Sequence, residues 1–120
     1  MAAPNLKNPS TITGKTVRYA VTTTLAAALS NASNSNRVFK INSIFCANID
    51  GANTADITAT HFDGTTDVAL ASTITVPADA TQVLSSNQTY FYLEEGQSIR
   101  AQASANGDLV LIISYEDFAL

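Results

Sequence analysis

The sequence predicts an all-β fold: a single antiparallel β-sandwich, jelly-roll or immunoglobulin-like, with seven to nine strands. Three observations lead to this prediction. β-branched and aromatic residues gather in short segments, turn residues separate these segments, and no stretch has convincing helical periodicity. Connections of two to seven residues suit antiparallel pairing and leave no room for crossover helices. The chain has 120 residues, 46% of them hydrophobic, which is enough for one core.

The first part of the chain divides into an arm and two strands. Residues 1–10 contain two prolines and no periodicity, so we expect an extended N-terminal arm, followed by one β-sandwich domain over residues 11–120. Residues 11–24 are rich in Thr and Val and predict a strand, with Gly14 as a bulge or bend. Residues 25–29 are Leu and Ala, which favour helix, but the segment is too short for a stable helix and we predict a strand.

The longest predicted strand covers residues 37–49. Alternation places on one face, which we take as the core side, Phe39, Ile41, Phe45, Ala47 and Ile49. The opposite face, which we take as outward, carries Val38, Lys40, Asn42, Ile44, Cys46 and Asn48. The loop that begins at Asp50-Gly51 is expected to close a hairpin with a returning strand over residues 56–62.

The remaining strands are shorter and end at strong turn signals. Pro77 ends a strand over residues 68–76, because proline cannot donate to a sheet ladder. Asn106-Gly107 is the strongest hairpin signal, since a type I′ turn needs positive φ at both positions. We expect it to join strands over residues 98–104 and 109–115. Two further short strands are predicted over residues 82–85 and 90–93.

The composition excludes several classes of function. The net charge is −4 and only 13% of residues are charged, so there is no basic surface for a phosphate backbone and nucleic-acid binding is excluded as the main activity. No apolar run has the length of a signal peptide or a membrane span, so we expect a protein made in a cytoplasm without a membrane anchor. Cys46 is the single cysteine, so no intrachain disulfide can form.

No constellation of residues indicates catalysis. His61 is the sole histidine, and no nucleophile-elbow pattern accompanies it. Cys46 and His61 fall on strands that we expect to be adjacent, but a buried structural cysteine is the simpler interpretation. One His and one Cys cannot form a tetrahedral zinc site, and the aspartates lack the spacing of a calcium-binding loop. We therefore expect no enzyme activity, no cofactor and no metal site.

Surplus apolar surface predicts contact with another protein. The strand over residues 109–115 is apolar on both faces, with Val110 and Ile112 opposite the expected core side. Ile44 adds apolar surface to the expected outward face of its own strand. Some of this surface should meet a partner. A covering loop or a third layer would explain the same pattern.

The N-terminal arm supplies a second candidate contact. It has little charge and no pattern of its own, which is typical of a segment that becomes ordered on a neighbour, and equally of simple disorder. We take Leu6 and Pro9 as its candidate contact residues.

Five short motifs follow one another between residues 37 and 116. They are RVFKINSIFCANIDG at residues 37–51, ADIT at 55–58, VPADA at 76–80, LEEGQSIR at 93–100 and ISYE at 113–116. In this order they resemble a pattern found in small β-sandwich virion proteins of tailed bacteriophages. The resemblance implies a non-enzymatic structural protein of the virion, with capsid decoration as the expected role. A ring component of the neck, collar or tail is the alternative.

The resemblance also implies the partners. We expect contacts with other virion proteins, above all the major capsid protein, and between copies of the chain in a homo-oligomer. It implies neither a nucleic-acid nor a membrane partner, and it carries no catalytic residues.

A carbohydrate-binding β-sandwich module is the alternative from a different class of function. Tyr90 and Tyr92 would supply its stacking platform, together with the turn aspartates Asp50, Asp63 and Asp67. The chain has no tryptophan, so core or interface packing of these tyrosines is the favoured interpretation.

Overall fold

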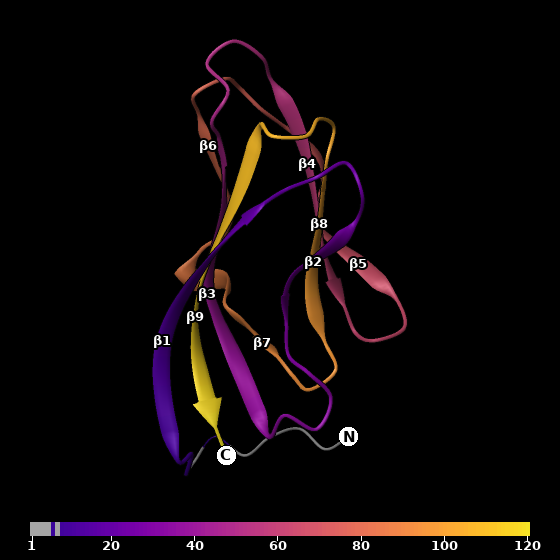
Figure 1. Cartoon of the computed structure of the whole chain (residues 1–120). Coiled ribbons are helices and arrows are strands. Elements are labelled where there is room, and N and C mark those ends of the chain that lie inside the picture. The colour runs from indigo at the N-terminus through magenta and orange to yellow at the C-terminus, as the bar shows by residue number, and fades with distance from the viewer. Residues whose placement is uncertain (1–5, 7) are drawn as a thin grey trace.

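The structure, a computed structural model, describes Leu6 and residues 8–120. Within these residues, nine β-strands form two antiparallel sheets packed face to face, and one 3₁₀ turn, η1 (Asn87–Thr89), is the only helical element. Figure 1 shows the two layers side by side. The predicted all-β sandwich is therefore confirmed. No helix in this part of the chain is long and apolar enough to cross a membrane.

We call the five-stranded layer sheet A and the four-stranded layer sheet B. Sheet A has the order β1 (Thr11–Ala20), β9 (Leu109–Ala119), β3 (Arg37–Asn48) and β6 (Thr81–Ser85), and β3 also pairs with β7 (Phe91–Leu93). Sheet B has the order β2 (Ala26–Ser30), β8 (Ser98–Ala103), β4 (Ala55–Phe62) and β5 (Asp67–Val76). The ambiguous Leu and Ala segment is a strand, as predicted.

The strands pair in a nested order. β1 pairs with β9, β2 with β8, β3 with β6 and β7, and β4 with β5. The chain is thus folded back on itself about the β4–β5 turn, and the resulting double strand is wrapped into two sheets. This arrangement is that of a jelly roll rather than an immunoglobulin-like sandwich.

Two predicted hairpins are wrong. The loop that begins at Asp50 leads from β3 in sheet A to β4 in sheet B, and the loop containing Asn106 and Gly107 leads from β8 in sheet B to β9 in sheet A. Gly107 does have a positive φ of 84°, as its turn signal requires. A turn signal specifies a local reversal of the chain, however, and not which strands pair.

The core lies between the sheets and is filled by alternate residues of their strands. In β9 every odd-numbered residue from Leu109 to Asp117 is buried, while the even-numbered ones are partly exposed. The largest fully buried apolar side chains are Ile41, Ile44, Ile57, Leu93, Ile99, Leu109, Leu111 and Ile113. Each such burial contributes about 1.5–3 kcal/mol relative to an exposed side chain.

A bulge in β3 overturns part of the predicted face assignment. The register against β9 shifts between Ile41 and Ser43, so Asn42 is an additional residue in β3. Beyond it the faces exchange: Ile44 and Cys46 point into the core and Phe45 points outward. The expectation that Ile44 contributes outward apolar surface is therefore wrong, because its side chain is 0% exposed. A strict alternation of two cannot survive an inserted residue.

Gly14, which we expected to form a bulge or bend, instead continues the ladder. It lies opposite Glu116 in an unbroken register between β1 and β9. A Cβ at this position would meet nothing within 4 Å, so the glycine leaves open space on the strand.

The described part of the predicted arm meets the sandwich at the start of β1. Ser10 N donates to the carbonyl of Ala119 at 2.7 Å, and Leu6 and Pro9 are half-buried. The rest of the expected 1–10 arm, residues 1–5 and 7, lies outside the described residues.

A charged cluster joins three strands of sheet A near the C-terminus. Asp117 of β9 is 1% exposed, and its Oδ2 accepts hydrogen bonds from Lys15 Nζ of β1 at 2.9 Å and from Arg37 Nη1 of β3 at 2.8 Å. Burial by itself would raise the pKa of Asp117, but the two cations outweigh it and hold the pKa below its ordinary value. Side chains as well as backbone therefore hold β1 and β3 to β9.

Candidate docking surface

The outward face of sheet A carries a patch of apolar side chains in adjacent register. Two rows cross the strands: Phe45 lies between Val83 and Ile112, and Val110 lies between Ala47 and Ala20. We call these six residues the outer apolar patch. None of them belongs to the core between the sheets.

The patch is open to solvent to different degrees. Val83 is 58% exposed at the β6 edge, while Phe45, Val110 and Ile112 are half-buried by their neighbours within the sheet. Arg18 lies opposite Ile112 at the β1 edge and is exposed. The apolar side chains that a partner would cover thus lie in the middle of sheet A, and the cation of Arg18 lies at one edge of the patch.

Polar residues bound the patch at its Ser114 end, whereas Ile49, two residues beyond Ala47 of β3, is an exposed apolar residue at the other end. Ser114 lies opposite Ser43 on one side and Thr16 on the other. The next residues outward on β9 and β3, Glu116 and Lys40, lie opposite each other, with Nζ and Oε1 4.0 Å apart. An apolar centre with a polar margin is typical of protein interfaces, and the patch has such a margin at its Ser114 end.

The predicted contact residues of the two strands lie on different faces of sheet A. Val110 and Ile112 face outward, as expected, and their role as partner contacts stays a prediction. Ile44 faces the core and is removed from the candidate set. Sequence reasoning missed Phe45 and Val83. The adjacent polar pair Asn42-Ser43, which interrupts the alternation of the strand, was the one signal of the bulge that turns Phe45 outward.

The expectation that the strands of Cys46 and His61 are adjacent is wrong, because β3 and β4 belong to different sheets. Cys46 pairs with Leu111 and Gln82 in sheet A, whereas His61 pairs with Ile99 and Val68 in sheet B. Cys46 is fully buried, and burial raises the pKa of its thiol to about 11. A buried, protonated thiol is a poor nucleophile.

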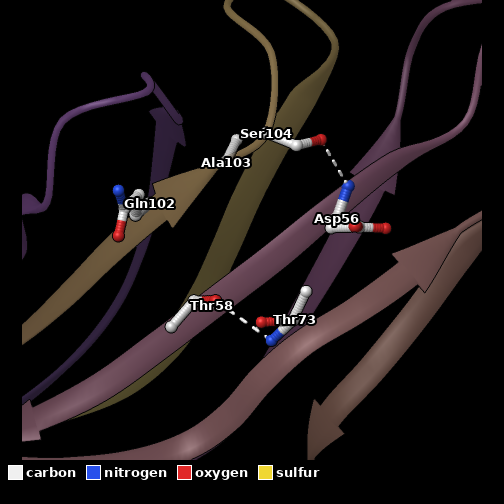
Figure 2. A pocket seen from close by; sticks show the side chains of 6 residues that line it. All are labelled: Asp56, Thr58, Thr73, Gln102, Ala103 and Ser104. Carbon is white, nitrogen blue, oxygen red and sulfur yellow. Dashed lines mark hydrogen bonds between the residues drawn. The ribbon is translucent and has the colours of Figure 1, made fainter.

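A shallow pocket of about 220 Å³ on the outward face of sheet B offers no reactive group (Figure 2). It is lined by Asp56, Thr58, Thr73, Gln102, Ala103 and Ser104. Its polar groups bond mainly to one another: Asp56 N donates to Ser104 Oγ at 2.8 Å and Thr73 N donates to Thr58 Oγ1 at 3.0 Å. The single carboxylate there accepts a hydrogen bond from Thr75. The lining therefore contains no acid–base pair and no nucleophile with a base.

The tyrosines proposed for sugar stacking do not form a flat platform. The rings of Tyr90 and Tyr92 meet edge to face, at 85° with centroids 6.0 Å apart, and Lys40 Nζ lies 4.5 Å from the centre of the Tyr90 ring. Asp50 and Asp63 accept backbone N–H groups of their own turns, which lowers the pKa of both carboxyls. These groups serve local structure, so this geometry does not favour a carbohydrate site.

Among the described residues, no group of three or more His, Cys, Asp or Glu side chains could hold a metal ion. Comparison with known proteins assigns no family: no family model matches the chain, and no curated protein does.

One solved structure has a similar fold. It is a structure of Bacillus endospore appendages, which form a family of disulfide-linked pili. The alignment covers 100% of this chain and 97% of that chain, with 12% sequence identity and a TM-score of 0.55. At this identity the likeness shows a shared fold alone.

Proposed function

We propose that this chain is a non-enzymatic structural protein of a bacteriophage virion, acting as a capsid decoration protein that docks through the outward face of sheet A. The observation that carries the proposal is the outer apolar patch. Two rows of apolar side chains lie on the solvent side of a sheet whose other side already fills the core. Burying such a patch on another protein is favourable, and the polar residues at its Ser114 end would fix the orientation of the partner.

The contrast with sheet B supports the choice of face. The corresponding outward side of sheet B is polar around Thr58 and Gln102, which lie opposite each other. Arg100 there is occupied by Asp67, at 3.2 Å, and by the ring of Phe62. A partner would gain less from covering this side.

This chain cannot use the disulfide linkage that is reported for the pilus of similar fold. That structure belongs to a family of disulfide-linked pili. The present chain has one cysteine, and Cys46 is fully buried, so folded copies cannot be linked through it. We therefore propose that this protein assembles by non-covalent contact.

Replacing Ile112 by aspartate is expected to abolish docking onto capsids and leave the domain folded. The new carboxylate would be placed in the centre of the outer apolar patch and would have to be desolvated on binding. Co-sedimentation of the purified protein with capsids lacking it measures the effect. We expect at least a tenfold loss of bound protein at a fixed concentration.

The matched control is Ser72→Asp, which adds the same charge to an exposed position of β5 in sheet B. It should bind capsids like the unmodified protein. Equal binding of Ile112→Asp and Ser72→Asp would contradict docking through sheet A. Fractionating heads from tails of intact particles distinguishes capsid decoration from a ring in the neck, collar or tail.

Deleting residues 1–10 is expected to weaken assembly while the sandwich stays folded. The deletion removes one backbone hydrogen bond seen in the described residues, from Ser10, and no strand. Thermal unfolding should therefore change little, while capsid binding should fall. Equal capsid binding by the full-length and truncated chains would show that the arm takes no part in docking.

A further inference from the structure

β1 forms an open edge of sheet A. It is the terminal strand in the sheet order and pairs only with β9, and Figure 1 shows it at the margin of the molecule with no strand beyond it. Its ten residues keep one register with β9, without a bulge. All of them are exposed except Val17 and Tyr19, which are half-buried. Among the described residues, no strand pairs with the outer side of β1.

The ladder shows which backbone groups of β1 are unpaired. Just beyond the strand, Val21 N donates to the carbonyl of Leu109, which continues the register as its opposite residue, at 3.0 Å. In an antiparallel ladder, hydrogen-bonded pairs alternate with non-hydrogen-bonded pairs. Odd-numbered residues of β1 therefore bond to β9. The residues whose N–H and C=O groups point to the open edge are Ile12, Gly14, Thr16, Arg18 and Ala20.

This edge has little protection against pairing. Proteins usually blunt an exposed edge with proline, a bulge, a very short strand or several charges. β1 has ten residues, no proline and no bulge. Of its two charged side chains, Lys15 is paired with Asp117, and only Arg18 has no carboxylate of a described residue within ion-pair distance.

We propose that β1 pairs antiparallel with β1 of a second copy, about a two-fold axis at Thr16. This register is the one that uses all five open residues of each strand. It sets Thr16 opposite Thr16 of the second copy and Ile12 opposite Ala20. It also sets Arg18 opposite Gly14, where no side chain competes for space and no like charge faces the guanidinium. β1 can therefore pair with a second β1 that runs in the opposite direction without steric or charge conflict at these positions. For this reason we take a second copy of the chain as the partner of the open edge.

The pairing would join the two A sheets into one continuous sheet. Both outer apolar patches would then lie on the same side of that sheet, on either side of the new strand pair. Two linked docking surfaces bind a repetitive partner more tightly than one, because the second contact becomes intramolecular. Dimer formation itself does not depend on the proposed function, so the two can fail separately.

Thr16→Pro tests the pairing in the full-length chain. Proline removes one N–H that points away from β9 and is tolerated at an edge strand, so no bond within the sandwich is lost. Thr16→Val keeps the N–H and is the matched control. By sedimentation equilibrium we expect dimers of the unmodified chain and of Thr16→Val, and at least a tenfold higher dissociation constant for Thr16→Pro. A monomeric unmodified chain at about millimolar concentration, or equal dimerisation of Thr16→Pro and Thr16→Val, would overturn the proposal.

Cross-linking tests the register and stays informative if the proline variant unfolds. In Thr16→Cys, the two new thiols would lie across a hydrogen-bonded pair with Cα atoms about 5.5 Å apart, within disulfide range. In Ala20→Cys, on the same face, the two thiols would be eight residues out of register, roughly 26 Å apart. Mild oxidation should link Thr16→Cys into dimers and leave Ala20→Cys unlinked, since the native Cys46 is buried. Equal linking of both variants, or none in Thr16→Cys, refutes the register about Thr16.

The dimer and the docking surface are separable. Thr16→Pro should be monomeric yet still bind capsids, more weakly, through one patch. Ile112→Asp should dimerise and not bind capsids.

Discussion

Replacing Leu111 by alanine is expected to lower the free energy of unfolding by about 2–5 kcal/mol, the usual cost of removing a large aliphatic side chain from a packed core. Leu111 is 0% exposed and lies in the centre of β9, the strand between β1 and β3. Since domains of this size are stable by about 5–15 kcal/mol, the variant should show a markedly lower midpoint of denaturation. Urea titration followed by circular dichroism measures the change.

Its sequence neighbour provides the control. Ile112 faces outward and is half-buried within the sheet, so Ile112→Ala leaves no enclosed cavity and should cost less than about 1 kcal/mol. A loss of stability in Ile112→Ala equal to that in Leu111→Ala would show that a further layer covers the outer face. The outer apolar patch would then be covered within the chain itself and could not act as a docking surface.

Replacing Asp117 by asparagine is expected to destabilise the fold by about 1–3 kcal/mol, the scale of charge-assisted hydrogen bonds to one buried group. The carboxylate is buried while Lys15 and Arg37 are nearly half exposed, so solvent takes up part of the loss at the cations. Asparagine keeps the volume and removes the charge. A free energy of unfolding equal to that of the unmodified chain at pH 7 would show that the cluster adds nothing beyond the backbone ladder.

The contribution of Asp117 should depend on pH in a defined direction. Its pKa in the folded state lies below the ordinary value of 3.8, so the carboxylate stabilises the fold fully above that value. The stabilisation is lost as the pH falls through the lowered pKa, where the folded state must also take up the proton. The difference in stability between the unmodified chain and Asp117→Asn should therefore be constant from about pH 5 to 7 and shrink below about pH 4.

Some features of the candidate site could be predicted from alternation alone. β9 runs from Leu109 to Ala119 without a bulge against β1, so Val110 and Ile112 lie on the side away from the core, as the sequence pattern indicates. The expectation for Ile44 failed because Asn42 is inserted into the register of β3. An inserted residue is accommodated by contacts with β9, more than sixty residues away in sequence, which no local pattern contains.

The pairing of strands could not be predicted from local sequence patterns either. Asn106 and Gly107 do reverse the chain, but the strands on either side enter different sheets. Strands are chosen as neighbours by how much apolar surface the whole sandwich buries, and that choice involves every strand at once. The open edge of β1 is a consequence of this choice and has no signature in residues 11–20 alone.

The sequence by itself determined that this chain is a low-charge, all-β domain, where its strands fall, and which face of β9 is apolar in excess. These properties depend on neighbours a few residues apart, whose periodicity follows directly from strand geometry. Only the tertiary structure decided the nested sheet order, the outward position of Phe45 and the unpaired edge at β1. Each of these depends on contacts between distant segments, and such contacts exist only when the two sheets close over a common core.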